Sequence, residues 1–144
     1  SYQNEIVAAD KNYVTIHNSD QPAEVGWISW NIPYKYSKGK LVAATTSTTT
    51  VKSLIANNKK DKYSKYFAKN QFVTAKKLTF YNGSKVAYTV PKGKVVTLTK
   101  LSLSKDVIYL QFKYGKKTGW AHVNGAKYNF NKPWFQGVNA RLAG

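Results

Sequence analysis

Short strand-like runs separated by tight turns fill residues 78–123, and this pattern constrains the fold most strongly. The runs are rich in β-branched and aromatic residues, and they cover 78–81, 86–90, 94–99, 107–114 and 119–123. Between them, Asn82-Gly83 favours a type I′ hairpin turn, and residues 91–93 and 115–118 are typical turn sequences. Five strands in about fifty residues, without a helix, predict a small barrel of the SH3 type.

A second strand–turn–strand unit is predicted near the start of the chain. Residues 13–16 (YVTI) align with residues 109–112 (YLQF), and Gly26-Trp27 then falls on Gly119-Trp120. The loop before the Gly-Trp pair is three residues longer in the first unit, and we expect no earlier strands before that unit. We therefore expect a mostly β chain with one complete SH3-like small barrel and a second, partial or rearranged SH3-like unit. Chance similarity between two amphipathic hairpins is the alternative.

These patterns divide the chain into four parts. Residues 1–40 form the first, partial unit, and 76–128 form the complete module. Residues 41–75 form a linker or insert that includes a Ser/Thr tract, 43–50, which is typical of a linker or an exposed edge strand. A short helix is expected later in this insert, with Asp61 as its cap and with Tyr63, Tyr66 and Phe67 on one face. Residues 129–144 are expected to be extended and to pack on the barrel.

Positive charge is concentrated in the larger, C-terminal part of the chain. Residues 1–34 contain four acidic side chains and one basic one, whereas residues 35–144 contain 22 basic and two acidic side chains. Such a field attracts polyanions: nucleic acid, acidic lipid, or the glycerol- or ribitol-phosphate polymers of a bacterial wall. All the basic side chains except Arg141 are lysines, which suit a flexible phosphate chain better than base edges. The alternative is that the lysines only keep the protein soluble.

The sequence carries few signs of catalysis. It has no cysteine, and the two histidines, His17 and His122, fall on different positions of the aligned units. His122 is expected to be a structural strand residue, and Asp10, Asp20 and Glu24 to be solvated turn carboxylates. Motifs for a nucleophilic serine, a phosphate-binding loop or a dinucleotide site are absent from the sequence. We therefore predict no enzymatic activity, no catalytic residue, no metal and no cofactor.

Lysines and aromatic residues alternate throughout the basic region, as in Tyr34-Lys35-Tyr36 and Phe112-Lys113-Tyr114. Aromatic rings present flat faces to sugars or bases, while ammonium groups contact phosphates. For any single pair, alternation between the two faces of a strand is a sufficient explanation. Taken together with the charge, the pairs favour a binding surface around the 107–123 hairpin.

Residues 76–128 resemble the SH3-like cell-wall-binding modules of Gram-positive surface proteins. The pattern of Tyr109 and Phe112, the turn of Gly115 to Lys117 and the sequence GWAHV from Gly119 is similar to GW modules. The preceding PKGK turn and the Val-Val-Thr strand are similar to the surface-layer attachment domains of lactobacilli. Residues 41–75 match neither family.

The resemblance implies a secreted, non-catalytic module that anchors a larger surface protein to lipoteichoic or wall teichoic acid at the cell wall. We expect eight residues to bind the polymer, with lysines at the phosphates and aromatic residues shaping a groove: Lys113, Lys116, Lys117, Lys127, Tyr109, Tyr114, Trp120 and Tyr128. No apolar run is long enough to cross a membrane. The alternatives are a nucleic-acid-binding barrel, and an adhesin or bacteriocin-type module that binds polyanions such as host glycosaminoglycan.

Overall fold

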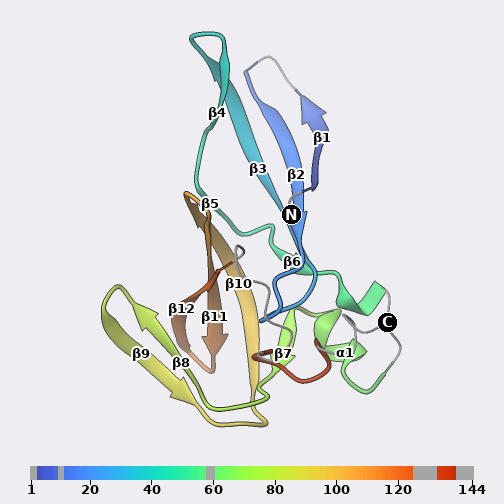
Figure 1. Ribbon diagram of the computed structural model, residues 1–144, viewed down its shortest axis with the longest axis vertical. Coiled ribbons are helices and arrows are strands. Elements are labelled where there is room, and N and C mark those ends of the chain that lie inside the picture. Colours follow the sequence, from blue (N-terminus) through green and yellow to red (C-terminus); the bar gives the residue numbers. More distant parts are fainter. Residues whose placement is uncertain (1–2, 10–11, 58–60, 125–132, 139–144) are drawn as a thin grey trace.

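The chain folds into two antiparallel sheets with very little helix. The computed structural model describes residues 3–9, 12–57, 61–124 and 133–138 (Figure 1). Strands account for 59% and helices for 6% of the structure, so the expected mostly β fold is confirmed. The first sheet is built from the N-terminal third of the chain, and the second is built mainly from residues after Gln71.

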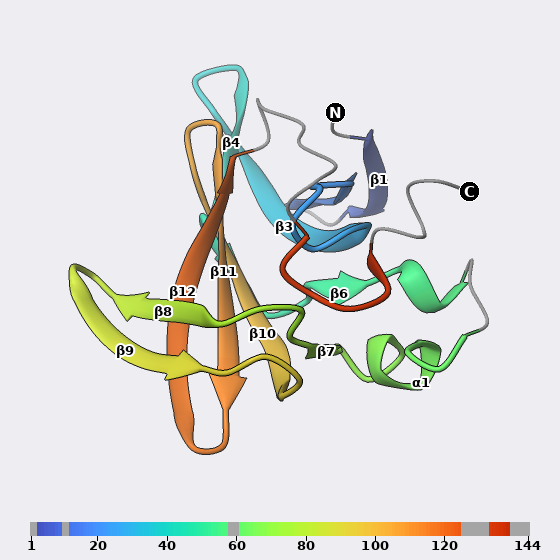
Figure 2. The ribbon, with the colours of Figure 1, turned by 60° about the horizontal axis from the view of Figure 1, so that its bottom comes forward.

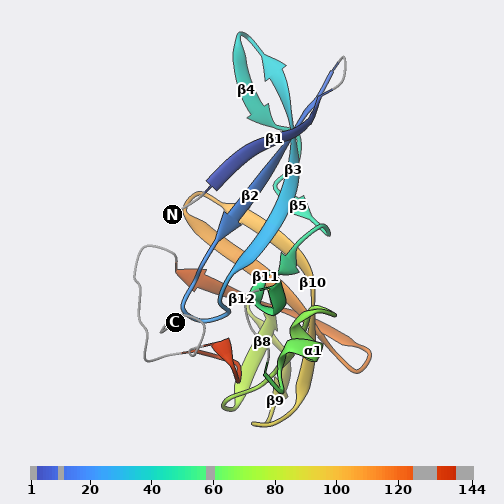
Figure 3. The ribbon, with the colours of Figure 1, turned by 90° about the vertical axis from the view of Figure 1, so that its right-hand side faces the viewer.

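The N-terminal sheet contains five strands. In spatial order these are β1 (Gln3–Ala9), β2 (Val14–Asp20), β3 (Ile28–Ser37) and β4 (Lys40–Ala43), and the short β6 (Lys52–Ser53) pairs with the start of β3. The expectation that no strand precedes the first Gly-Trp unit is wrong, because β1 precedes β2 and pairs with it. Lys38 and Gly39, both with positive φ, form the tight turn between β3 and β4. Ile28, Trp30 and Ile32 are buried in the first half of β3, whereas its second half is exposed. The far end of this sheet therefore projects away from the rest of the molecule (Figure 3).

The second sheet contains seven strands. Its order is β5 (Ser47–Thr48), β10 (Val95–Ser104), β11 (Val107–Tyr114), β12 (Lys117–Asn124), β8 (Leu78–Asn82) and β9 (Lys85–Val90). The short β7 (Gln71–Val73) pairs with the start of β10, and β5 with its second half. A register shift between Leu98 and Lys100 separates these halves, and a bulge at such a point bends a strand. The Ser/Thr tract thus contributes an edge strand.

The strand pattern is confirmed, but the expected closed barrel is not. All five predicted strands of residues 78–123 are present, with β10 longer than predicted. The sheet stays open because β9 does not pair with β7 or β10. Between them stands the buried Thr74, whose hydroxyl donates to the carbonyl of Pro91 and accepts from the amide of Lys94. The backbone of Thr74 also donates to the carbonyl of Lys94 and accepts from the amide of Gly93, so its contacts reach the turn between β9 and β10 and form no ladder with β9.

The turn between β8 and β9 differs from the predicted type I′ turn. Asn82 pairs with Lys85, so the central residues are Gly83 and Ser84 instead of Asn82 and Gly83. Gly83 has a φ of 64°, and Ser84 is not among the residues with positive φ. Positive φ at the first central residue alone is the signature of a type II′ turn.

The two Gly-Trp hairpins also differ in register, which corrects the expectation that they are equivalent. In the second hairpin Phe112 lies opposite Gly119. The alignment would place Ile16 opposite Gly26, but Ile16 lies opposite Ile32 instead. Gly26 precedes β3 in a turn with a φ of 78°, whereas Gly119 lies within β12. The similarity of the two sequences is therefore not a similarity of strand pairing.

One short helix, α1 (Ser64–Phe67), lies where the sequence predicts a helix in the insert. The expectation that Asp61 is its cap is wrong: the N-cap residue is Tyr63, without a side-chain cap hydrogen bond, and the Asp61 carboxylate accepts a hydrogen bond of 2.8 Å from the amide of Tyr63. Phe67 is buried against Phe72, with ring centroids 5.4 Å apart, while Tyr63 and Tyr66 are partly buried. A 3-10 turn, η1 (Ile55–Asn57), precedes α1.

A single hydrophobic core joins the two sheets. It combines Ile28 and Trp30 of β3 with Phe72 of β7 and Phe112 of β11. Residues 133–138 complete it, because Phe135 is buried 4.8 Å from Phe72, centroid to centroid. Residues 133–138 therefore pack between the sheets, as a bend, a β-bridge and a turn instead of the expected extended segment, and this junction positions the groove described next.

Candidate binding groove

The outward faces of β11 and β12 bring aromatic residues together. Along β11, Ile108, Leu110 and Phe112 are buried, so Tyr109 and Gln111 point outward. Across the ladder, Tyr109 lies opposite His122, and Gln111 lies opposite Trp120. The rings of Tyr109 and His122 have centroids 5.9 Å apart. One outer surface therefore carries Tyr109, Trp120 and His122 side by side.

The β8–β9 hairpin forms a second wall beside this surface. It crosses β11 and β12 (Figure 2) and meets β12 where Tyr81 lies opposite Trp120. Leu78 and Phe80 of β8 are buried, so the alternate residues Thr79 and Tyr81 face outward. Tyr81 is 42% exposed although it is a large ring.

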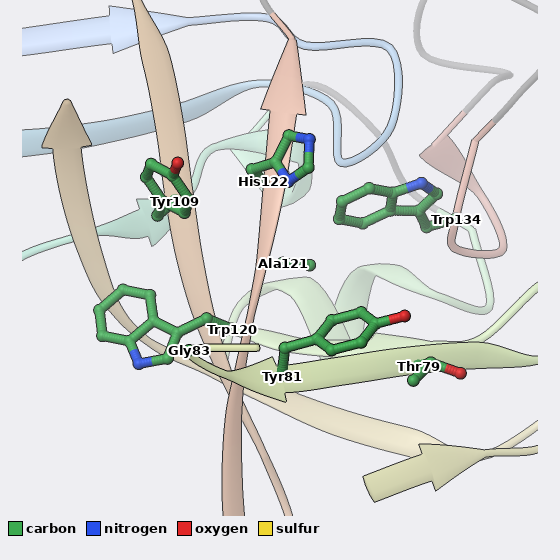
Figure 4. A pocket seen from close by; sticks show the side chains of 8 residues that line it. All are labelled: Thr79, Tyr81, Gly83, Tyr109, Trp120, Ala121, His122 and Trp134. Atoms are coloured by element: carbon green, nitrogen blue, oxygen red, sulfur yellow. The ribbon is translucent and has the colours of Figure 1, made fainter. Parts of the chain in front are cut away.

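A hollow of about 500 Å³ lies where β8 diverges from β12. The described residues of its lining are mostly aromatic and include no carboxylate and no lysine: Thr79, Tyr81, Gly83, Tyr109, Trp120, Ala121, His122 and Trp134. In Figure 4 the rings of Tyr81, Tyr109, Trp120, His122 and Trp134 surround Ala121. This volume is within the range of small-molecule sites.

Trp134 reaches the hollow from the C-terminal segment, which both sheets hold in place. Its amide donates to the carbonyl of Glu24, and its carbonyl accepts from the amide of Ala75, at 2.9 and 2.8 Å. The next residue, Phe135, forms a β-bridge with Thr74. The position of the Trp134 ring thus depends on both parts of the fold.

A second, smaller hollow of about 280 Å³ adjoins the first and carries positive charge. It shares Thr79, Tyr81, Ala121 and Trp134 with the larger hollow and adds Lys76 and Lys77, both exposed. The two hollows together form one groove, which we call the β8–β12 groove. It has an uncharged aromatic part and a lysine part.

Gly119 explains why the Gly-Trp pair stands beside this groove. A Cβ atom on Gly119 would lie 2.9 Å from the Cβ atoms of Phe80 and Ala87, closer than real contacts allow. Glycine therefore lets the β8–β9 hairpin pack directly on β12, and Trp120 follows on the outward face. Gly26 has another role, because its φ of 78° is the left-handed conformation that glycine adopts readily.

The structure separates the eight predicted binding residues into three groups. Tyr109 and Trp120 line the groove. Lys113 is exposed two residues beyond Gln111 on the same face of β11, and Lys116 and Lys117 lie at the exposed β11–β12 turn, outside the lining. Tyr114 also lies outside the lining, because its ring packs 5.8 Å from that of Tyr88. Lys127 and Tyr128 fall outside the described residues.

The sequence analysis missed the rest of the groove. Tyr81 and Thr79 had a local signal, since alternation along β8 places them on the face opposite Leu78 and Phe80. His122, expected to be structural, is exposed and lines the groove. Trp134 and the Lys76-Lys77 pair had no local signal in the sequence, because their proximity to Trp120 arises only from tertiary folding.

Asp20 and Glu24, which were expected to be turn carboxylates, are not among the described residues that line the groove. An Asp20 carboxylate oxygen accepts a 2.8 Å hydrogen bond from the neighbouring amide of Gln21, as is typical of a turn. Glu24 contacts the groove segment through its backbone carbonyl. Asp10 lies outside the described residues. Within the described ranges, no group of three or more His, Asp or Glu side chains is placed to hold a metal ion.

Comparison of the chain with protein-family models, with characterised proteins and with solved structures finds no match. None of the helices in the described part of the chain has the length and apolar character that crossing a membrane requires. The groove itself is therefore the basis for any functional assignment.

Proposed function

We propose that this protein is a non-catalytic module that binds an anionic polymer of a Gram-positive cell wall, wall teichoic acid or lipoteichoic acid, through the β8–β12 groove. The observation that carries this proposal is the continuity of the aromatic hollow with the hollow that contains Lys76 and Lys77. A repeating chain of phosphates and polyols or sugars presents both kinds of group that such a groove accommodates.

Charge favours this class of ligand. The 22 basic and two acidic side chains of residues 35–144 create a field that attracts a polyanion before contact. Neither hollow is lined by a carboxylate among the described residues, so phosphates would meet no local repulsion. Lys113, Lys116 and Lys117 lie beyond the lining at the end of the same hairpin, where they would interact with a longer chain.

The resemblance of residues 76–128 to SH3-like wall-binding modules supports the same conclusion. Gly119-Trp120, the hallmark pair, borders the groove, and four of the five GWAHV residues belong to its lining or to the close contact that shapes it. We propose that the second sheet is an open, SH3-like unit whose parent is a secreted surface protein. Host glycosaminoglycan is a second polyanion that combines negative charge with sugar rings.

Sedimentation of the protein with purified cell walls tests the proposal. We expect it to sediment with intact walls and to stay in solution after teichoic acid is extracted. Binding should weaken steeply as salt rises from about 0.05 M to about 0.5 M, because screening acts on phosphate–lysine contacts. Released reducing sugar or free amine would indicate lysis instead of binding, and we expect neither.

Matched charge variants locate the site. The double variant Lys76→Gln/Lys77→Gln should lose wall binding, whereas Lys38→Gln/Lys40→Gln, at the projecting end of the N-terminal sheet, removes the same charge far from the groove. Equal losses in both variants would show that net charge, and not the groove, governs binding. Stronger binding to single-stranded DNA than to teichoic acid at equal phosphate would favour the nucleic-acid alternative.

A further inference from the structure

We infer that the aromatic part of the β8–β12 groove binds a sugar substituent of the polymer, so that the protein distinguishes glycosylated from unglycosylated poly(alditol phosphate). This inference rests on the proposed function and specifies which chemical group the groove selects. A bare chain of glycerol or ribitol phosphates would need only lysines. Among the described residues the larger hollow is lined by aromatic side chains and no lysine, which suits a ligand group that is uncharged and has a broad face.

The shape and chemistry of the aromatic part fit a sugar ring. Tyr81, Tyr109, Trp120 and Trp134 surround a space of about 500 Å³ (Figure 4), and a pyranose has apolar C–H faces that aromatic rings cover well. The rings come from β8, β11, β12 and the C-terminal segment, which lets them contact a ligand from different sides. A flat lipid surface or a bare phosphate would leave most of this surface without contact.

Polar groups within the lining are available for the hydroxyls of a sugar. Tyr81, Tyr109 and His122 line the hollow and make no side-chain hydrogen bond to another described residue. The phenol and imidazole groups can each donate and accept. A sugar ring buried between aromatic faces would therefore find partners for its hydroxyl groups at the same site, as carbohydrate specificity requires.

The lysine part fixes where the charged backbone of the polymer would lie. Lys76 and Lys77 share Tyr81 and Trp134 with the aromatic part, so a phosphate at the lysines is a direct neighbour of a ring in the hollow. A phosphodiester unit that carries a sugar has this combination of groups. Free sugar and free phosphate each fill one part only, and we expect both to bind far more weakly than the joined unit.

Titration of the full chain with three probes tests the inference. The probes are glycosylated poly(ribitol phosphate), the same polymer after enzymatic removal of its sugars, and heparin, at equal anionic charge. We expect the glycosylated polymer to bind at least about tenfold more tightly than the deglycosylated one, since tenfold corresponds to about 1.4 kcal/mol, within the range of one aromatic stacking contact.

Two exposed tyrosines supply variants that should remain folded. Tyr81→Ala and Tyr109→Ala remove rings that are 42% and 37% exposed, and each should bring the ratio of affinities for the glycosylated and deglycosylated polymers close to one. The control is Tyr36→Ala, a ring that is 70% exposed on β3 and does not line the groove, which should retain the full preference. Unchanged circular dichroism confirms that each variant is folded.

The outcomes separate this inference from the proposed function. Equal affinity for the glycosylated and deglycosylated polymers overturns the inference and leaves the proposed function standing. Failure to bind either polymer overturns both. Tighter binding of heparin than of both wall polymers also overturns both, and identifies a sulfated host polysaccharide as the partner.

Discussion

The hydroxyl of Tyr88 donates a hydrogen bond of 2.7 Å to the carbonyl oxygen of Phe112. Both residues are buried, and Tyr88 lies on β9 whereas Phe112 lies on β11. The bond therefore ties the β8–β9 hairpin to β11. It lies close to Gly119 of β12, which is the residue opposite Phe112. The wall of the groove formed by β8 is held in place from behind by this contact.

Replacing Tyr88 by Phe should lower the free energy of unfolding by about 1 kcal/mol, the usual net contribution of one buried hydrogen bond. The ring itself stays, so its contacts with Phe80 and Tyr114 are kept. Chemical denaturation at neutral pH measures the change. Tyr36→Phe, which removes a hydroxyl from a highly exposed ring, should leave stability unchanged.

The same residue predicts how stability responds to alkaline pH. Burial raises the pKa of the Tyr88 phenol well above its usual value of 10, because the phenolate would lose hydration. Above about pH 10 the unfolded chain then binds fewer protons than the folded chain, so this residue's contribution to stability falls as pH rises. The stability difference between the native protein and Tyr88→Phe should therefore shrink above pH 10. A constant difference would contradict the raised pKa.

Gly119→Ala should destabilise the second sheet by about 1–3 kcal/mol, the usual cost of overpacking a tight contact. The new methyl group would meet the Cβ atoms of Phe80 and Ala87 at 2.9 Å. Thermal or chemical denaturation gives the loss, and Thr118→Ala, an exposed change one residue away, is the control. A neutral effect of Gly119→Ala would mean that the hairpin does not pack closely on β12.

Local pattern was sufficient to predict the strands but not their closure. Alternation and turn residues lie within a few positions of each strand, so β8 to β12 could be read from the sequence. Closure depends on whether β9 finds a partner at the far end of the sheet. At that end Thr74 makes side-chain hydrogen bonds to Pro91 and Lys94, which are 17 and 20 positions away, and no local pattern encodes such contacts.

The candidate site was partly predictable for the same reason. Tyr109 and Trp120 face outward on neighbouring strands, and the sequence places them on one hairpin. Tyr114 was expected beside them, but it follows the buried Phe112 by two positions and shares the inward face, where it packs on Tyr88. Trp134 could not be assigned, because hydrogen bonds to Glu24 and Ala75 place it, and no local pattern encodes them.

Neutralising Lys76 and Lys77 should weaken binding of the wall polymer more than neutralising Lys116 and Lys117. The first pair adjoins the aromatic rings, whereas the second lies at the β11–β12 turn, outside the lining. Each double Lys→Gln variant removes the same charge, so a difference in affinity reports position and not net charge. Titration of each double variant with the wall polymer at two salt concentrations measures its affinity and the salt dependence of that affinity. A larger loss from the turn pair would move the phosphate site to the hairpin end, as the sequence pattern first indicated.

Gly137→Ala should weaken ligand binding through Trp134, although Gly137 does not line the groove. Gly137 has a φ of 84°, and a Cβ atom there would lie 2.9 Å from Cδ2 of Tyr63, so the variant must shift the segment that carries Trp134. The expected results are a loss of about 1–3 kcal/mol in stability and weaker polymer binding.

Gly115→Ala is the matched control for this change. It carries a similar backbone conformation, with a φ of 61°, but a Cβ atom there meets nothing within 4 Å. It should therefore cost about 1 kcal/mol from backbone strain alone and leave binding intact. Denaturation and polymer titration of both variants give the two comparisons. If Gly137→Ala lost stability but bound the polymer as tightly as Gly115→Ala, the groove would not depend on the position of Trp134, and β8, β11 and β12 alone would form the binding surface.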